Sequence, residues 1–330
     1  MKETLLCCRI TAQEKGLYRL CHDGVEQAAQ VSGKFQYEAL GLSDYPTVGD
    51  EVLADLNGGG QAVIHKVLPR KSLFLRKAAG TAREEQPVAA NVDILFLCMA
   101  LNNDFNLRRL ERYLAAAWNS GATPVVVLTK ADLCGNPSEK VAAVEEAAPG
   151  TDVLLTSAAQ EDGIRPLLPY LTPGRTVAFV GSSGVGKSTL MNGLLGKEIL
   201  ATGGLRNDDR GRHTTTRRQM FFLPGGAALI DTPGMRELGL WDSESGLETA
   251  FVDIEALARQ CRFRDCRHEK EPGCAVRAAL ASGELSEERF RSWQRLSAEN
   301  RYADDRAAHM SAKEKKFRMI AQFNKSNSKR

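Results

Sequence analysis

GSSGVGKST, at residues 181–189, is the stretch that decides the fold of this chain. Its glycines let successive backbone amides point at phosphate oxygens, and the dipole of the following helix adds to the attraction. TVAFV precedes it as a strand and TLMNGLL follows it as a helix, as a phosphate loop requires. Lys187 would neutralise the β and γ phosphates, and the Ser188 hydroxyl would bind magnesium. The residues expected to contact the nucleotide are Gly181, Ser182, Ser183, Gly184, Val185, Gly186, Lys187, Ser188 and Thr189.

The segment TKAD, at residues 129–132, predicts which base is bound. Asp132 can accept hydrogen bonds from N1 and N2 of guanine, a pair of donors that adenine lacks, and the stem of Lys130 can lie over the ring. TKAD follows the apolar run PVVVL, and TSA at residues 156–158 follows DVLL and can direct a backbone amide at guanine O6. We therefore predict GTP rather than ATP. The base-side residues are Thr129, Lys130, Asp132, Ser157 and Ala158.

DTPG, at residues 231–234, follows the strand-like run AALI. Asp231 would hold magnesium through water, and the Gly234 amide would meet the γ phosphate. The preceding run LRNDDRGRHTTTRRQM has no regular periodicity and lies where a first switch belongs, so one threonine of residues 214–216 should complete the magnesium shell. Met235 cannot orient water as a glutamine would, which leaves His213 as the best local candidate. The alternative is that His213 only caps the backbone or contacts phosphate.

The order of these motifs is unusual, because the base-reading segment precedes the phosphate loop. Between residues 91 and 240, apolar strand-like runs alternate with the helical segments LRRLERYLAAAW and SEKVAAVEEAA. This alternation predicts a covered, mostly parallel sheet. We therefore predict a circularly permuted P-loop GTPase domain at 91–240 within a multidomain α/β protein.

The regions that flank the predicted GTPase domain differ from it in their sequence patterns. Residues 1–77 contain the strand-like runs GLYRLC, KFQYEAL, DEVLADL and QAVIHKVL, which predict a small antiparallel β-barrel. Residues 78–90 lack periodicity and are predicted to be a linker. Residues 241–330 are predicted to be helical and end in a basic tail, which is either a solvated terminus or an RNA-contacting arm.

Composition narrows the class of protein. The 44 basic and 41 acidic residues leave a net charge of +3, too little to indicate nucleic-acid binding by itself. The N-terminus lacks a signal-peptide pattern, and no run of about 18 apolar residues occurs. We expect a cytoplasmic protein without a membrane segment. Its eight cysteines are then thiols or metal ligands rather than a disulfide framework.

Four potential metal ligands, Cys261, Cys266, His268 and Cys274, are separated by four, one and five residues. Three thiolates and one imidazole make a closed tetrahedral zinc set with no position left for substrate. We predict one structural Zn²⁺ here, in addition to Mg²⁺ with GTP. The alternative is a group of unliganded thiols near a helix end.

The order TKAD, TSA, GSSGVGKST, RHTTT, DTPG and then Cys-x4-Cys-x-His-x5-Cys resembles the circularly permuted, small ribosomal subunit-dependent GTPases of the RsgA family. The resemblance covers nearly the whole chain and implies an OB-fold for the N-terminal barrel and a C-terminal helical zinc-binding domain. It implies a GTPase that acts late in assembly of the small ribosomal subunit and is stimulated by it. The expected partners are that subunit, its rRNA and GTP or GDP, with the chain as a monomer. By position, hydrolysis would be assigned to His213 and magnesium binding to Thr215.

The chain departs from the family pattern at one position of the base-reading segment. Thr129 replaces the Asn of N-K-x-D, which should weaken support for Lys130 and the phosphate loop without removing the Asp132 contact. The chain after DTPG runs on into the predicted zinc region, so we hypothesise that loss of the γ phosphate reorients that region relative to the barrel. The rival hypothesis is a nucleotide-gated binding module in which hydrolysis is incidental.

Overall fold

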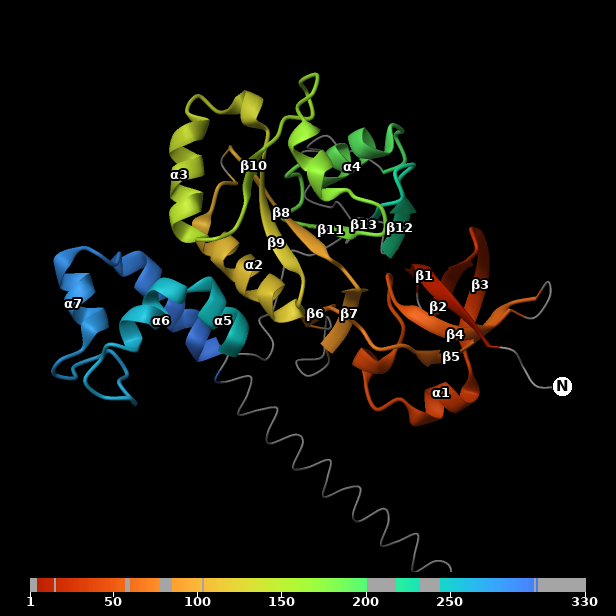
Figure 1. Ribbon diagram of the computed structural model, residues 1–330, viewed down its shortest axis with the longest axis horizontal. Coiled ribbons are helices and arrows are strands. Elements are labelled where there is room, and N and C mark those ends of the chain that lie inside the picture. Colours follow the sequence, from red (N-terminus) through yellow and green to blue (C-terminus); the bar gives the residue numbers. More distant parts are fainter. Residues whose placement is uncertain are drawn as a thin grey trace, which may run out of the picture. The chain divides into compact units, whose positions relative to one another are not determined.

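A computed structural model describes residues 5–301, except 15, 57–59, 78–84, 103, 201–217, 232–243 and 300 (Figure 1). The chain forms two compact units, Met1–Gly239 and Leu240–Arg330, and each is described by itself. Among the residues described, none of the helices has the length and apolar character needed to span a bilayer.

The first unit begins with a closed five-stranded barrel (Figure 1). Its strands pair in the order β1-β2-β3-β5-β4, and β4 pairs back with β1. All pairs are antiparallel except β3 with β5. Ile10, Leu20 and Ile64 are fully buried in its core, and the architecture confirms the predicted OB-like barrel. The strands are β1 (Leu6–Glu14), β2 (Leu17–His22), β3 (Val25–Val31), β4 (Glu51–Asp55) and β5 (Ala62–Val67).

The prediction of a strand at KFQYEAL is wrong. This run forms helix α1 (Gly33–Glu38), and a 3-10 turn, η1 (Leu42–Asp44), follows it. The Ser32 hydroxyl caps the helix by accepting a hydrogen bond from the Phe35 amide at 3.1 Å. Phe35 then packs against the barrel core. The cap and this single apolar anchor outweigh the β propensity of Phe and Tyr.

The second half of the predicted linker, residues 85–90, is a strand. β6 (Leu73–Lys77) pairs antiparallel with β7 (Glu85–Ala90) in a separate two-stranded sheet. The register shifts after Phe74, opposite Pro87, which has no amide to donate to the ladder. The consecutive residues Val88, Ala89 and Ala90 are all buried, so β7 lacks the alternation by which a strand is recognised in sequence.

The rest of the first unit is a six-stranded sheet in the order β10-β9-β8-β11-β13-β12. Its pairs are parallel except that of β12 with β13. The carboxyl ends of the parallel strands therefore meet at one edge, although the chain visits them in permuted order. The strands are β8 (Ile94–Ala100), β9 (Thr123–Thr129), β10 (Val153–Leu155), β11 (Thr176–Val180), β12 (Arg218–Phe222) and β13 (Ala228–Asp231).

Helices cover both faces of this sheet (Figure 1). Phe96 of β8 packs in one cluster with Leu190 of α4, whereas the next residue, Leu97, lines a cavity with Leu110 of α2. Since neighbouring side chains of a strand point to opposite faces, α4 and α2 lie on opposite sides. The elements are α2 (Leu107–Ser120), η3 (Ala131–Leu133), α3 (Pro137–Ala147), η4 (Arg165–Tyr170) and α4 (Lys187–Leu195).

β12 joins the sheet to the barrel. It pairs antiparallel with β1, so that Ala12 lies opposite Gln219 and Gln13 opposite Arg218. Arg218 is buried and donates to Gln13 Oε1 at 3.1 Å and to the Pro87 carbonyl. The barrel and the sheet therefore share one hydrogen-bonded ladder.

The second unit is helical in its described part. Phe251, Ile254 and Val276 are fully buried, and Arg289 pairs with both carboxylate oxygens of Asp253 at 2.6 and 2.7 Å. Its helices are α5 (Glu244–Ala250), α6 (Val252–Ala258), α7 (Ala275–Ser282) and a further helix at 287–299.

Gly49 is predicted to be a sensitive position in the barrel. Its φ is +93°, and a Cβ there would lie 2.1 Å from the Ala90 carbonyl oxygen, whereas Gly24 has a φ of +80° and open space around it. We expect Gly49→Ala to lower the free energy of unfolding by more than about 3 kcal/mol and Gly24→Ala to cost about 1 kcal/mol of backbone strain. Urea unfolding followed by circular dichroism measures both. Equal midpoints for the two variants would contradict the steric argument.

Candidate nucleotide site and metal cluster

The phosphate loop connects β11 to α4 at the carboxyl edge of the sheet. All three of its glycines have positive φ angles, and a Cβ on Gly181 would lie 2.3 Å from the Cys98 carbonyl oxygen of β8. Only glycine therefore allows the loop to leave β11 this close to β8. Lys187 starts α4, and its Nζ donates to the carbonyls of Gly181 and Ser182 at 2.7 and 2.8 Å. The ammonium group thus lies inside the curve of the loop.

The base-reading segment supports the phosphate loop directly. The Thr129 hydroxyl donates to the Val185 carbonyl at 2.5 Å, and Lys130 Nζ donates to the Gly184 carbonyl at 2.7 Å. Lys130 has a φ of +56°, which turns the chain at the end of β9. The threonine at the Asn position of N-K-x-D therefore does contact the loop, through a hydroxyl rather than an amide.

The residues predicted to read guanine, which follow β9 and β10, also meet. The Ser157 hydroxyl donates to Asp132 Oδ1 at 2.5 Å, which orients the carboxylate on the exposed edge. The Ser157 amide donates to the Gly163 carbonyl at 3.0 Å. Ala158 is exposed, so its amide stays the predicted donor to guanine O6 in this segment.

Two of the predicted magnesium residues lie in the described part of the chain. Asp231 ends β13 opposite Phe179 of β11, beside the start of the phosphate loop. Ser188 is the second residue of α4. The other predicted site residues, His213, Thr215 and Gly234, lie outside the described residues, as do Met235 and the basic tail.

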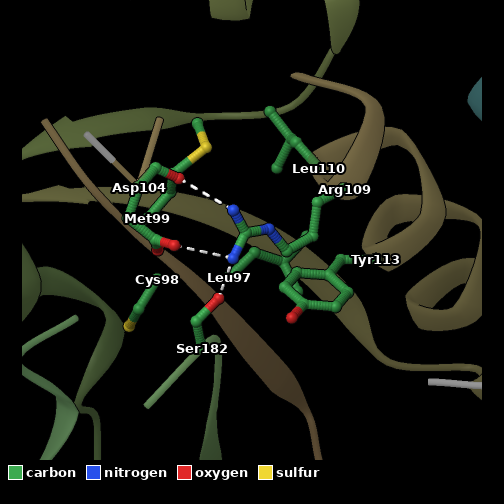
Figure 2. Close-up of a pocket in the computed structure, with 8 residues that line it drawn as sticks. All are labelled: Leu97, Cys98, Met99, Asp104, Arg109, Leu110, Tyr113 and Ser182. Atoms are coloured by element: carbon green, nitrogen blue, oxygen red, sulfur yellow. Dashed lines mark hydrogen bonds and ion pairs between the residues drawn. The ribbon is translucent and has the colours of Figure 1, made fainter. Parts of the chain in front are cut away.

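Sequence reasoning missed a contact between α2 and the phosphate loop. Arg109 donates to the Ser182 hydroxyl and to Asp104 (Figure 2). The run LRRLER contains three arginines, and no motif distinguishes one of them. Helical spacing offers a signal, because Arg109 precedes the buried Tyr113 by four residues and so neighbours it on the helix surface.

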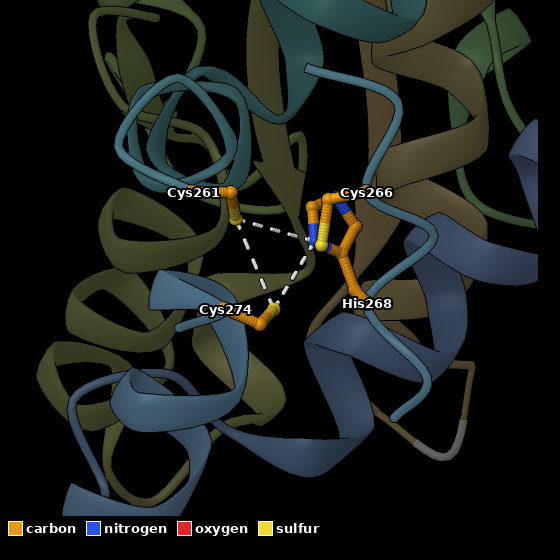
Figure 3. A group of neighbouring side chains, drawn as sticks. All are labelled: Cys261, Cys266, His268 and Cys274. Atoms are coloured by element: carbon orange, nitrogen blue, oxygen red, sulfur yellow. Dashed lines mark hydrogen bonds between the residues drawn. The ribbon is translucent and has the colours of Figure 1, made fainter. Parts of the chain in front are cut away.

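The four predicted metal ligands of the second unit converge (Figure 3). Their ligand atoms all lie within 4.8 Å of one another. Cys261 Sγ is 3.8 Å from Cys274 Sγ, and His268 Nδ1 is 3.6 and 3.4 Å from these two sulfurs. Tetrahedral zinc with Zn–S bonds of about 2.3 Å requires sulfurs about 3.8 Å apart. The cluster, completed by Cys266, could hold a metal ion and fits the geometry of zinc.

A carboxylate orders the loop that carries the histidine ligand. Glu271 accepts hydrogen bonds from the amides of Arg267, Glu269 and Lys270 at 3.0, 2.9 and 2.9 Å. The bond from Arg267, with those from the neighbouring amides, lowers the pKa of Glu271 to about 2, so the carboxylate stays ionised at neutral pH. His268 itself has a φ of +61° at the centre of this turn.

Comparisons with known proteins agree with this geometry. The model of the RsgA GTPase family matches residues 67–241. A curated relative from Lactiplantibacillus plantarum, "Small ribosomal subunit biogenesis GTPase RsgA 2", is 50% identical over 295 residues, 89% of this chain and 83% of the relative. "Small ribosomal subunit biogenesis GTPase RsgA 1" of Oceanobacillus iheyensis is 41% identical over 327 residues, 98% of this chain and 93% of the relative.

Two solved structures are similar. YjeQ from Thermotoga maritima gives a TM-score of 0.65 at 27% identity, covering 89% of this chain and 97% of that one. YloQ, described as a circularly permuted GTPase, gives 0.63 at 23% identity, covering 92% and 96%, and supports the fold alone. The ABC transporter model matches residues 166–329, which include the phosphate loop, a motif found in many nucleotide-binding families. With the permuted order of strands, the convergent base and phosphate loops and relatives that match nearly end to end, the chain belongs to the RsgA GTPase family.

Proposed function

We propose that this chain binds the small ribosomal subunit and hydrolyses GTP to drive a late step of its assembly, with hydrolysis stimulated by that subunit. The observation that carries the GTPase assignment is the direct contact between the base-reading and phosphate loops, from Lys130 Nζ to the Gly184 carbonyl. The names of the curated relatives support the small subunit as the partner. On this proposal the chain acts in the cytoplasm as a monomer, with its rRNA contacts made by the barrel and the basic tail.

The nucleotide would be held by groups that the structure brings to one edge. Amides of the phosphate loop and Lys187 would bind the β and γ phosphates, with Ser182, Ser183, Val185, Gly186 and Thr189 completing the loop. Asp132 would accept from N1 and N2 of guanine, and the Ala158 amide would donate to O6. The stem of Lys130 would form the surface on which the base lies.

Magnesium, when bound, neutralises charge on the β and γ oxygens. Ser188, Asp231 and Thr215 are its proposed ligands, with Asp231 acting through water. His213 is the proposed group that positions the attacking water. The Gly234 amide would meet the γ phosphate. The assignments of Thr215, His213 and Gly234 rest on sequence position.

We propose that each domain binds a different ligand: residues 1–77 bind RNA, 91–240 bind GTP, and 241–330 hold one structural Zn²⁺. β12 begins within the last residues of the run predicted to hold the first switch and pairs with β1, which supports a link between nucleotide state and the barrel. The second switch leads on into the zinc unit. A change in the relative placement of barrel and zinc unit between GTP-analogue and GDP forms is the expected consequence.

The base assignment predicts the effect of Asp132→Asn. An amide donor would face the guanine donors in place of the carboxylate, so GTP affinity should fall about 100-fold. Xanthosine triphosphate, which presents an acceptor at C2, should bind better than GTP to the variant. Competition against a fluorescent nucleotide measures both affinities. Asp23→Asn, in an exposed turn of the barrel, is the matched control. Unaltered base preference in the Asp132 variant argues against the assignment.

The ribosomal assignment predicts strong acceleration of GTP hydrolysis by purified small subunits and none by large subunits. His213→Ala should lose about 100-fold or more of the stimulated rate while retaining GTP affinity. Glu145→Ala, at an exposed position of helix α3 and outside the proposed nucleotide and RNA contacts, serves as the control. Tight binding to small subunits with unchanged turnover would instead favour the nucleotide-gated binding module.

The metal assignment predicts one zinc ion per chain in metal analysis of the purified protein. Cys266→Ser should lower the zinc content and the thermal stability of the second unit, because three ligands bind zinc more weakly than four. GTP affinity should stay within about twofold, since the nucleotide residues belong to the first unit. Cys21→Ser, in the barrel, is the matched control. Full zinc occupancy in Cys266→Ser would disprove this ligand set.

A further inference from the structure

Arg109 lies where α2 meets the phosphate loop (Figure 2). Its Nη1 donates to the Ser182 hydroxyl and to Asp104 Oδ1 at 2.8 Å, and its Nη2 donates to the Asp104 carbonyl at 2.9 Å. The Arg109 amide donates to the side chain of Asn106 at 3.0 Å, which caps α2. Both the backbone and the guanidinium of this residue are therefore fixed.

Ser182 connects two cations. Its hydroxyl accepts from Arg109, and its carbonyl accepts from Lys187 Nζ at 2.8 Å. Lys187 Nζ has three N–H donors, and the carbonyls of Gly181 and Ser182 already use two of them. Lys187 must therefore leave the Ser182 carbonyl to bind the phosphates of a nucleotide. Arg109 faces no such competition at Ser182, since it contacts the Ser182 hydroxyl and not the Ser182 carbonyl. The contact with Arg109 can therefore hold Ser182 while Lys187 moves.

The cluster around Arg109 includes a buried polar atom whose desolvation costs stability. Asp104 Oδ2 is buried and makes no hydrogen bond within the described part of the chain, whereas the Tyr113 hydroxyl lies beside the Ser182 hydroxyl. Both residues line a small cavity together with Leu97, Leu110 and Ser182. Burial raises the pKa of Tyr113, which stays protonated. Buried polar atoms without partners destabilise a fold, whereas apolar side chains of the same shape would not.

We infer that Arg109 is a positioning residue for phosphate binding, which keeps the phosphate loop in its binding shape by holding Ser182 while Lys187 transfers from the loop carbonyls to the phosphates. The planar fork of an arginine suits this role, because it can bind Asp104 at two points and still reach Ser182. Preorganisation of this kind lowers the cost of ordering a loop on binding. The role rests on the proposed GTP site.

Comparison of GDP with GMP isolates the contribution of Arg109 to binding of the β phosphate. GDP places its β phosphate in the loop and GMP does not, so Arg109→Ala should weaken GDP about tenfold while changing GMP affinity less than about twofold. Competition against a fluorescent GDP analogue measures both affinities. Arg112→Ala, one turn further along α2, is the control and should keep the wild-type preference. A merely structural loss would weaken both nucleotides equally.

Ser182→Ala removes the same hydrogen bond without altering α2 and should reproduce the loss. It decides the question if Arg109→Ala fails to fold, as judged by thermal unfolding. The double variant should lose no more than either single variant. A GDP-over-GMP preference within about twofold of wild type in Ser182→Ala, or in folded Arg109→Ala, would overturn the role of Arg109. Failure of the wild-type protein to bind GDP at all would instead remove the proposed GTP site, and this role with it.

Discussion

The parallel pairing of β8 with β11 is the contact on which the nucleotide site depends. β8 belongs to the half of the sheet that carries the base-reading segment, and β11 leads into the phosphate loop. Their register runs from Val177 opposite Ile94 to Val180 opposite Leu97, and Gly181 continues it with a close approach to Cys98. A shift of one residue would turn the side chains of β11 to the wrong faces and move the loop away from Thr129 and Lys130.

The groups that would engage a nucleotide are paired within the protein. Lys187 and Lys130 donate to loop carbonyls, and Asp132 accepts from Ser157. Binding would therefore exchange partners around these charges rather than satisfy isolated ones. Such a site has a defined shape before the ligand arrives, and less ordering remains to oppose binding.

The sequence predicted the elements whose local pattern and tertiary environment agree. TVAFV and PVVVL are continuous apolar runs followed by motifs, and they lie in the buried strands β11 and β9. KFQYEAL failed because a serine cap decided its local structure, and β7 failed because only its pairing with β6 identifies it as a strand. Motifs also predicted the residues of each loop but not the contacts between loops. The hydrogen bonds from Thr129 to Val185 and from Arg109 to Ser182 join residues 56 and 73 positions apart in the sequence. The residue spacing within a motif does not predict contacts between segments so far apart.

The ladder between β1 and β12 sets an order of events during synthesis. The five strands of the barrel are complete by residue 67, so the barrel can close through β1 and β4 early. Gln13, however, meets Arg218 across 205 residues of chain. At cellular rates of translation, the ribosome takes on the order of 10 s to make the intervening segment. During that time the outer edge of β1 at Ala12 and Gln13 lacks its partner strand. An unpaired strand edge of this kind is prone to wrong pairing. The first strand to be made is thus among the last to be completed.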